Sequence, residues 1–456
     1  MEKEIIRKLR KYENFLIYKG ISLIDRSEYE LTMTEQSRLI LSPLVDFVKQ
    51  VKLLLRHKLS KNKIHKKDVL FIIYTPNNFD TLAPIIKKMK DNFLVVKRDG
   101  FINNVAKKLN NNINYNDIEG YLTNELSRNI RKARKSLKNK YKEILKTGEF
   151  DKQNLSYLFL IYFPEMVRYI EIINNMLSIE QPKLLVVMNE INTIGNIAVF
   201  VAKQRRIKTL CIQHGVIGDI LGFTPVSVDK ITVWGNSSRR ALIKKTVPKE
   251  KIIITGASKF DNIGKFNEEI TKNIAREIGL DLSKKYVLFT TQNIPLIEET
   301  VKHLCIAVKS ISGLQLVIKT HPAEYSIKNY QQIIKKSGVK GIVTSKYLYY
   351  LIEGCSAMIT VASTTGLEAL IMEKPLITLN FFGKTDPMPY AESGSAIGVY
   401  KSEGIAPAIK SILEDQNVRK ELSKKAKLFV YDQCYEMDGK ASERILNLIK
   451  EMTSHL

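Results

Sequence analysis

The amino-acid sequence predicts an α/β protein with two doubly wound domains. Short, near-continuous apolar segments alternate with segments of helical character over most of the chain, as in parallel sheets that helices cover on both faces. The length of 456 residues exceeds one ordinary hydrophobic core, so we expect two domains. Polar residues follow most of the apolar segments. In doubly wound sheets, ligands bind outside the carboxyl ends of the strands.

The first domain is expected to span residues 1–228. The chain up to about residue 60 is predicted to be mainly helical, and a long basic helical region is predicted between residues 116 and 177. The expected strands of this domain are Asp68–Tyr74, Phe93–Lys97, Leu184–Met188 and Lys208–Gln213. The third strand is followed by Asn189 and Glu190, and the fourth ends in His214-Gly215.

The second domain is expected to span residues 229–425, with a final helical segment at 426–456. Its expected strands are Lys230–Trp234, Lys251–Thr255, Tyr286–Thr290, Leu314–Lys319, Gly341–Thr344, Met358–Val361 and Pro375–Leu379. Each is a short apolar run bounded by turn residues, and the chain after Ala406 is predicted to be helical to its end.

The net charge of +25 points to an anionic partner: nucleic acid, anionic lipid or an anionic small substrate. The excess is concentrated in two runs, Val48–Lys67 and Ser127–Lys142. A basic amphipathic helix of this kind can lie on an anionic membrane surface, although a solvated helix face explains the pattern equally well. Few aromatic residues accompany the runs and no zinc-finger spacing is present, so nucleic-acid binding is not favoured.

The cysteines and the termini indicate a cytosolic protein. The four cysteines are scattered without a CxxC pair, and buried thiols in a reducing compartment are the simplest interpretation. The N-terminus lacks the apolar core of a secretory signal, and no run reaches the roughly 18 apolar residues of a membrane span. We therefore expect a soluble protein, at most peripheral on the inner face of a membrane.

Two strand ends in the second domain predict a site for a phosphate attached to a ribose. The turn Ser363-Thr364-Thr365-Gly366 precedes a helix at once, so its backbone N–H groups and hydroxyls form an anion site. Glu368 lies one turn into that helix, within reach of a sugar hydroxyl. The strand Leu314–Lys319 leads into Thr320, His321 and Pro322. Further candidates at strand ends are Lys319, Gly256, Ser258, Thr291 and Gln292.

Two residues of the first domain are candidates for a general base. His214 has a suitable intrinsic pKa, and Gly215 allows a close turn that presents the imidazole. Glu190 could abstract a proton or orient the histidine. A structural role is open for each: His214 could bond to a nearby carbonyl, and Glu190 could cap the following helix.

Several chemistries are not indicated. The sequence has no GxxxxGK[ST] phosphate loop, no GxGxxG after a first strand, no HExxH and no GxSxG. It has no Asp-x-Asp, and its six histidines form no zinc spacing. A metal-free mechanism would stabilise a leaving nucleotide with helix N-termini, hydroxyls and cationic side chains.

The order of these motifs resembles the GT-B glycosyltransferase superfamily. The motifs are QHG, a strand ending in Trp234-Gly235, TGASKFD, KTHP, and STTGLEAL followed by KPLITL. Within the superfamily the chain is similar to capsule-type Kdo and sialic acid transferases, to CDP-glycerol glycerophosphotransferases and to UDP-N-acetylglucosamine 2-epimerases. The resemblance covers about residues 180–400. It implies two Rossmann-like domains facing a central cleft, with the C-terminal helix crossing back to the first domain.

The resemblance also implies residue roles. His321 and Ser363-Thr364-Thr365 would hold the donor phosphate, Glu368 the ribose, and His214 or Glu190 would deprotonate an acceptor hydroxyl. The sequence departs from the resemblance in two places: the acidic motif of the sialyltransferases is not evident, and Gln-His-Gly replaces the Trp-His-Gly of the glycerophosphotransferases.

The expected function is therefore that of a metal-independent, inverting glycosyltransferase. It would use a CMP-, CDP- or UDP-linked donor, no further cofactor, and a glycan or lipid-linked acceptor to build a cell-surface polysaccharide such as a capsule. The alternatives are a CDP-glycerol-type glycerophosphotransferase and a UDP-N-acetylglucosamine 2-epimerase-like isomerase.

Overall fold

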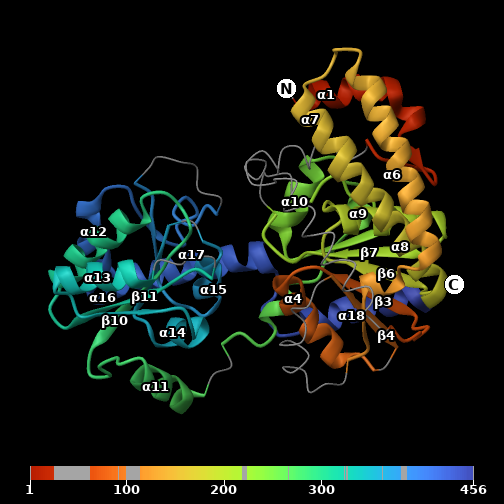
Figure 1. Cartoon of the computed structure of the whole chain (residues 1–456). Coiled ribbons are helices and arrows are strands. Elements are labelled where there is room, and N and C mark those ends of the chain that lie inside the picture. The colour runs from red at the N-terminus through yellow and green to blue at the C-terminus, as the bar shows by residue number, and fades with distance from the viewer. Residues whose placement is uncertain are drawn as a thin grey trace. The chain divides into compact units, whose positions relative to one another are not determined.

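A computed structural model describes residues 2–24, 62–90, 92–98, 113–217, 223–264, 267–322, 324, 327–361, 363–381 and 388–454. The chain divides into two compact units, each built around its own parallel sheet (Figure 1). Unit 1 comprises Met1–Trp234, Ser238–Lys259 and Lys440–Leu456, and unit 2 comprises Gly235–Ser237 and Phe260–Gly439. The predicted α/β fold with two Rossmann-like parallel sheets is confirmed.

The sheet of unit 1 has seven parallel strands in the order β5-β4-β3-β6-β7-β8-β9. The strands are β3 (Val69–Ile73), β4 (Phe93–Lys97), β5 (Tyr115–Asp117), β6 (Leu184–Val187), β7 (Lys208–Ile212), β8 (Lys230–Val233) and β9 (Ile252–Ile254). The order reverses between β3 and β6. At such a switch point the crossover helices diverge and leave a crevice at the strand ends.

Helices cover both faces of this sheet because the side chains of each strand alternate between the faces. Leu70 and Ile72 of β3 face the core that contains α8 (Phe163–Glu180) and α9 (Thr193–Gln204). The alternate β3 residues face a second core, which contains α4 (Pro76–Lys88) and α18 (Ala441–Ser454). Both faces of the central strands are thus buried, which explains their continuous apolar sequence.

The sheet of unit 2 has six parallel strands in the order β12-β11-β10-β13-β14-β15. The strands are β10 (Lys285–Thr290), β11 (Leu314–Lys319), β12 (Gly341–Thr344), β13 (Ala357–Thr360), β14 (Leu376–Leu379) and β15 (Ile397–Val399). The helices are α11 (Glu268–Glu277), α12 (Ile297–Lys309), α13 (Ile327–Ser337), α14 (Leu348–Gly354), α15 (Thr365–Ile371), α16 (Ile405–Glu414) and α17 (Gln416–Cys434). The switch point lies between β10 and β13.

The structure corrects the expected domain boundaries. Strand β8 pairs with β7, and β9 pairs with β8, so both extend the sheet of unit 1 and the boundary at residue 228 is wrong. The apolar sequence of an edge strand does not show which sheet it joins. At the other end, α17 belongs to unit 2, and the return to unit 1 begins at Lys440, not at residue 426.

The N-terminal third also differs in part from expectation. Residues 2–24 form α1 (Glu2–Leu9), a 3-10 turn at Arg10–Phe15 and a hairpin of β1 (Ile17–Tyr18) and β2 (Ile21–Ser22). Most of the basic run at 48–67 lies outside the described residues. The second basic run lies within α6 (Asn124–Leu145).

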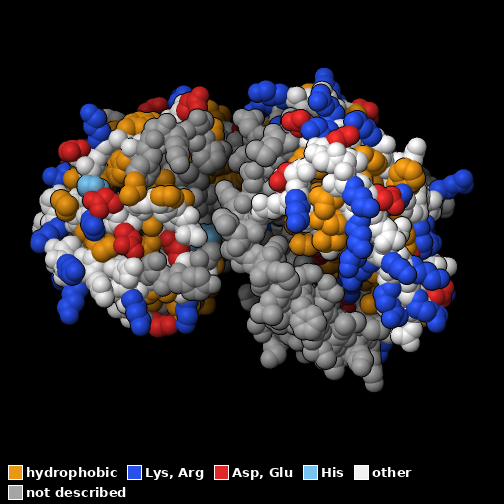
Figure 2. Space-filling view, turned by 45° about the horizontal axis from the view of Figure 1, so that its top comes forward, with side chains coloured by type: hydrophobic (Ala, Val, Ile, Leu, Met, Phe, Trp, Pro, Cys, Tyr) orange, Lys and Arg blue, Asp and Glu red, His pale blue; other side chains and the backbone are white. Residues whose placement is uncertain are grey.

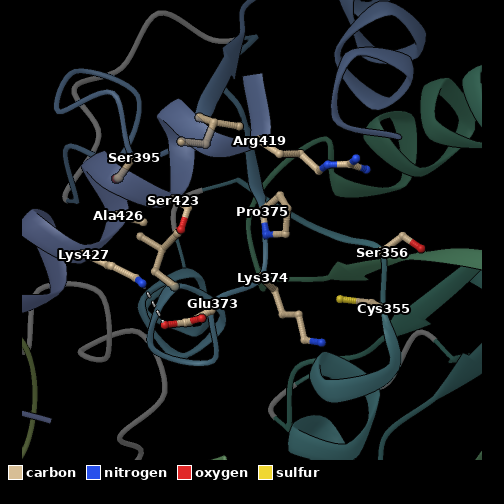
Figure 3. A pocket seen from close by; sticks show the side chains of 12 residues that line it. Cys355, Ser356, Glu373, Lys374, Pro375, Ser395, Arg419, Ser423, Ala426 and Lys427 are labelled. Carbon is tan, nitrogen blue, oxygen red and sulfur yellow. Dashed lines mark ion pairs between the residues drawn. The ribbon is translucent and has the colours of Figure 1, made fainter. Parts of the chain in front are cut away.

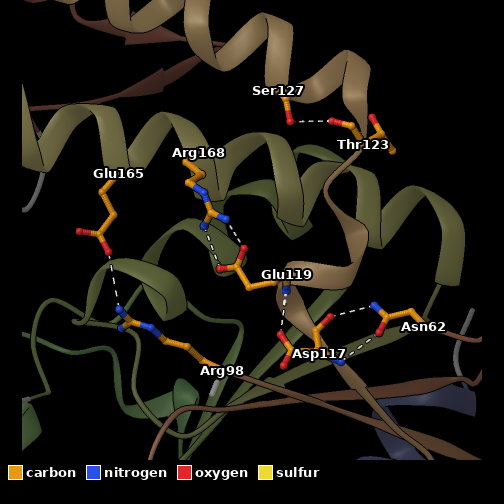
Figure 4. A network of polar contacts seen from close by, with 8 residues as sticks. All are labelled: Asn62, Arg98, Asp117, Glu119, Thr123, Ser127, Glu165 and Arg168. Atoms are coloured by element: carbon orange, nitrogen blue, oxygen red, sulfur yellow. Dashed lines mark hydrogen bonds and ion pairs between the residues drawn. The ribbon is translucent and has the colours of Figure 1, made fainter. Parts of the chain in front are cut away.

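A polar network anchors this helical layer to the sheet (Figure 4). The Arg168 guanidinium of α8 binds both carboxylate oxygens of Glu119, one at 2.8 Å, and both side chains are almost fully buried. Asp117 at the end of β5 exchanges two bonds with Asn62 at 2.8 and 3.1 Å. A buried, bidentate pair of this kind fixes the relative orientation of the two side chains as well as the distance between them.

All four cysteines are buried and form no disulfide. Of the helices in the described ranges, none is both long and apolar enough to cross a bilayer.

Candidate active site

Hydroxyl side chains meet at the switch point of the unit 2 sheet. The Thr290 Oγ1 atom at the end of β10 lies 2.9 Å from the Thr365 Oγ1 atom at the start of α15. The same Thr290 hydroxyl donates to Thr360 Oγ1 of the neighbouring strand β13 at 3.2 Å. The loop before α15 is thereby fixed to the two central strands, as a pre-organised ligand site requires.

The Ser363–Gly366 turn differs from the expected anion site. The Thr365 N–H donates to Ser363 Oγ at 3.2 Å, and the Gly366 N–H donates to the Ser363 carbonyl at 3.1 Å. These amides therefore hold the turn together. A Cβ atom at Gly366 would lie 3.0 Å from the Tyr390 ring and 3.1 Å from Leu376, so this glycine serves close packing. The hydroxyls of this turn that can donate to a ligand are those of Ser363, which is half-buried, and Thr364, which is exposed, since the Thr365 hydroxyl donates to Thr290.

The KTHP segment lies at the carboxyl end of β11, the strand that neighbours β10. The His321 N–H donates to both Thr291 Oγ1 and Glu324 Oε2 at 3.0 Å, and Thr291 Oγ1 also donates to Glu324. The other Glu324 oxygen accepts from the Tyr330 hydroxyl at 2.9 Å. Glu324 thus fixes the turn and leaves His321 and Pro322 exposed at the sheet edge.

Lys319 and Glu368 contribute charge to the same edge. Burial lowers the pKa of the Lys319 ammonium, an effect that the Glu368 and Glu324 carboxylates oppose. The ammonium donates to the Thr320 carbonyl at 2.9 Å. Glu368 is only 7 % exposed on α15, so it is not the solvated helix residue that its position in the sequence allows.

The structure brings most of the predicted nucleotide-site residues to one edge of unit 2. These are Lys319, His321, Pro322, Ser363, Thr364, Thr365, Gly366, Glu368, Thr291 and Gln292. Gln292, two residues beyond β10, is half-buried.

Gly256 and Ser258 were expected in the same group, but they belong to unit 1. Ser258 Oγ donates to the Thr81 carbonyl of α4 at 2.7 Å and is buried, which is a structural role. Gly256 adopts a φ of +83°, which favours glycine.

In unit 1, His214 lies at the carboxyl end of β7. Its Nδ1 atom is 2.6 Å from the Met188 carbonyl, which follows the neighbouring strand β6. A carbonyl only accepts, so Nδ1 carries the hydrogen and Nε2 holds the lone pair. Burial lowers the pKa of His214 below its usual 6.5, and the charge of Lys259 lowers it further. The imidazole is therefore neutral near pH 7, with Nε2 able to accept a proton.

Glu190 occupies a different environment from the one expected of a base. Its side chain is 2 % exposed, and Oε2 accepts from the Ser227 N–H at 2.7 Å and the Val228 N–H at 3.2 Å. A carboxylate that accepts two backbone N–H groups stabilises a loop conformation. Glu190 is thus engaged by the backbone of the Ser227–Val228 segment, whereas His214 keeps an available lone pair on Nε2.

Neighbouring side chains hold the His214 segment in place. Gln213 donates to the Gly215 carbonyl at 2.8 Å and to Ser238 Oγ at 3.0 Å. The Gln213 side-chain oxygen accepts from the Trp234 N–H at 2.7 Å, while the indole N–H donates to the Gln213 carbonyl at 3.0 Å. Gln213, which precedes His214, is therefore held at the end of the neighbouring strand β8.

The segment after β6 is also closely packed. A Cβ atom at Gly195 in the first turn of α9 would lie 1.9 Å from the Asn189 carbonyl oxygen and 2.6 Å from the Tyr74 hydroxyl. Only glycine allows this approach. The Tyr74 hydroxyl in turn donates to the Asn189 carbonyl at 2.9 Å. These contacts fix the chain just after Met188, whose carbonyl orients His214.

The residues that sequence reasoning missed are mostly of this supporting kind. They are Glu324, Gly195 and Met188. Thr290 and Gln213 each end an expected strand and were among the polar residues expected at the strand ends. Met188 acts through its backbone carbonyl, so its residue type carries no signal.

A cavity of about 350 Å³ in unit 2 lies away from these residues (Figure 3). It is bordered by Cys355 and Ser356, which precede β13, and by Lys374 and Pro375, which precede β14. It therefore lies at the amino ends of the strands, opposite the edge that carries the candidate site. Burial raises the pKa of the Cys355 thiol to about 12, so this thiol is unreactive near neutral pH.

Solved structures with the same fold come from several organisms. The Staphylococcus aureus MnaA–UDP complex is 15% identical, with 86% of this chain and 98% of that chain covered and a TM-score of 0.58. Neisseria meningitidis UDP-GlcNAc 2-epimerase bound to UDP-GlcNAc is 15% identical, with 84% and 99% covered and a TM-score of 0.57. A Rickettsia africae glycosyltransferase is 12% identical, with 86% and 100% covered and a TM-score of 0.54. At these identities the likeness shows the fold alone.

No curated protein sequence matches the chain significantly. The model of the UDP-N-acetylglucosamine 2-epimerase family matches residues 165–450, which is more than half of the chain. This match overturns the expectation of a glycosyltransferase and agrees with the epimerase alternative. It spans the His214 segment of unit 1 and the whole nucleotide-site edge of unit 2. The chain therefore belongs to the UDP-N-acetylglucosamine 2-epimerase family of enzymes.

Proposed function

We propose that the protein is an isomerase that inverts carbon C2 of a UDP-linked 2-acetamido sugar. The observation that carries the proposal is the family match over residues 165–450, because it includes both sets of candidate residues. Two structures of the same fold, from S. aureus and N. meningitidis, hold UDP and UDP-GlcNAc. Both ligands combine a uridine with a diphosphate, which is the chemistry that the hydroxyls and Lys319 of unit 2 suit.

Inversion at C2 requires that the C2–H bond break, its electron pair forming a C1=C2 double bond as the C1–O bond to UDP breaks. A proton then returns to the opposite face of C2 while UDP adds back at C1. A general base with an available lone pair is needed for the first step. His214 meets this requirement, since its Nδ1–H is engaged by the Met188 carbonyl and its pKa lies below the usual value. We assign His214 to proton transfer and Glu190 to holding the Ser227–Val228 segment.

The nucleotide would be held by unit 2. We assign the diphosphate to the hydroxyls of Ser363 and Thr364, the Lys319 ammonium and the exposed His321 side chain. Burial of Lys319 strengthens its interaction with an incoming phosphate, because less water screens the charge. Glu368, also on this edge, is assigned to the ribose hydroxyls, which donate to a carboxylate.

The test is incubation of the purified protein with UDP-GlcNAc and no acceptor. We expect the C2 epimer, UDP-N-acetylmannosamine, to accumulate to an equilibrium mixture that is also reached from the epimer. UDP-glucose, which lacks the acetamido group, serves as the matched control. Complete inertness toward UDP-GlcNAc, with no thermal stabilisation by UDP relative to CMP, CDP and GDP, would contradict the proposal.

A peripheral association with an anionic membrane is a separate proposal. It concerns the basic surface of unit 1.

A further inference from the structure

Helix α6 carries a stripe of cations on the face opposite its buried side. The stripe consists of Arg128, Arg131, Lys135, Lys138 and Lys142, all exposed, and we call it the α6 stripe. The buried residues of the helix are Ile130, Leu137 and Ile144. Arg128, Lys135 and Lys142 repeat every seven residues and are offset by two from the buried residues, about 200° around a helix, while Arg131 and Lys138 are offset by one, about 100°. From Arg128 to Lys142 the stripe extends about 21 Å at the rise of an α-helix.

The α6 stripe is not neutralised by carboxylates in the described part of the chain. Cations of the neighbouring N-terminal segment are paired: Lys8 with Glu4, Arg10 with Glu13, Lys11 with Glu149 and Lys19 with Glu171. On α6, Glu143 pairs with Lys140, which lies outside the stripe. Within the described ranges, no stripe residue forms an ion pair. Five like charges along one line repel each other unless an anionic surface lies against them.

Exposed apolar side chains lie on the flank of the same helix. Phe15 is 60 % exposed and Ile17 is 48 % exposed. Both border a cavity of about 450 Å³, whose other wall includes Lys132 and Ser136 of α6. The Lys140 ammonium lies 3.8 Å from the centre of the Phe15 ring. Lys and Arg side chains crowd the face of unit 1 that Figure 2 shows, with hydrophobic side chains beside them.

The helix is held rigidly on unit 1. Thr123 caps its N-terminus by accepting the Leu126 N–H at 3.2 Å. The Tyr141 hydroxyl lies 2.9 Å from Ser156 Oγ on the following helix, α7 (Lys152–Tyr157). Helix α6 also precedes the family-matched region, which begins at residue 165. The α6 stripe is thus a pre-organised surface on a part of the chain that the family match does not include.

We propose that the α6 stripe docks the protein on a bilayer that contains anionic phospholipid. Lipid phosphates would neutralise the stripe, and Phe15 and Ile17 would enter the interface along the flank of the helix. Nucleic acid fits less well, because a single-stranded chain would need aromatic side chains for stacking and the stripe contains none. The proposal does not depend on the proposed epimerase activity.

The experiment is vesicle flotation with full-length protein. We expect binding to vesicles of phosphatidylcholine with phosphatidylglycerol, none to phosphatidylcholine alone, and weaker binding at higher salt. Each cation near such a surface contributes roughly fivefold to partitioning, so R128E/K135E/K142E should reduce binding by about 100-fold or more. The control K410E/K420E/K424E makes the same charge change on exposed residues of α16 and α17 and should bind nearly as wild type.

A second variant distinguishes a bilayer from a soluble polyanion. Phe15→Ser with Ile17→Ser leaves the charge unchanged and should weaken vesicle binding several-fold, because it removes the apolar contact. Equal binding of the stripe variant and its control would overturn the proposal. Tight, salt-sensitive binding of an oligonucleotide would also overturn it, if vesicles do not compete with the oligonucleotide and the apolar variant binds it as tightly as wild type.

Discussion

The role of Glu190 gives the sharpest test of the site. Its Oε2 atom accepts the N–H groups of Ser227 and Val228, and the side chain is buried. Glu190→Ala leaves the buried Val228 amide and the half-buried Ser227 amide without this acceptor, and each unsatisfied group costs about 1–3 kcal/mol. We therefore expect unit 1 to lose about 2–6 kcal/mol of unfolding free energy. Glu190→Gln keeps one acceptor oxygen and should cost only about 1 kcal/mol, because neutral acceptors form roughly half as strong a bond.

The assay uses Trp234, the single tryptophan of the chain, which is buried in unit 1. Its fluorescence during urea unfolding reports the stability of that unit, and kcat is measured on the same samples. With a structural Glu190, the Gln variant keeps kcat within a few-fold of wild type. A kcat loss of 100-fold or more in a Gln variant of normal stability would identify Glu190 as the base and refute our assignment.

Three further predictions concern the proposed roles. Since burial and Lys259 lower the pKa of His214, its neutral base form persists below pH 6.5. Lys259→Gln removes the positive charge and should therefore shift the acid limb of the pH–rate profile to higher pH. The stability that neutral His214 contributes is present above pH 6.5 and is lost as pH falls through the lowered pKa. Thr365→Val removes the 2.9 Å bond to Thr290 and should weaken UDP binding about five- to tenfold in calorimetry. Glu324→Gln should raise KM about tenfold with little change in kcat, because it loosens the KTHP turn. An unchanged KM would show that Glu324 does not support substrate binding.

Much of the fold could be predicted from the sequence because buried parallel strands are apolar throughout. Each strand from β6 to β14 coincides with an expected apolar run, whereas β15 (Ile397–Val399) was not expected. The domain boundary could not be predicted, because β8 and β9 are the last two strands at one side of the sheet and their apolar sequence fits either sheet. The short β5, with the sequence YND, was missed since only Asn116 is buried.

The site could be predicted only where function depends on a side chain at a strand end. His214, Lys319, His321 and Ser363 follow this rule. Glu190 follows it too, and there the sequence could not distinguish a proton-transfer role from a carboxylate that accepts two backbone N–H groups.

Solvent exchange at C2 tests the proposed isomerase most directly. The protein is incubated with UDP-GlcNAc in D₂O and the sugar is followed by proton NMR. We predict that the C2 proton signal is lost and that the C2 epimer appears with deuterium at the same carbon. In His214→Ala both events should slow by about 100-fold or more while UDP still binds. Retention of the C2 proton in wild-type protein that binds UDP-GlcNAc would contradict the account.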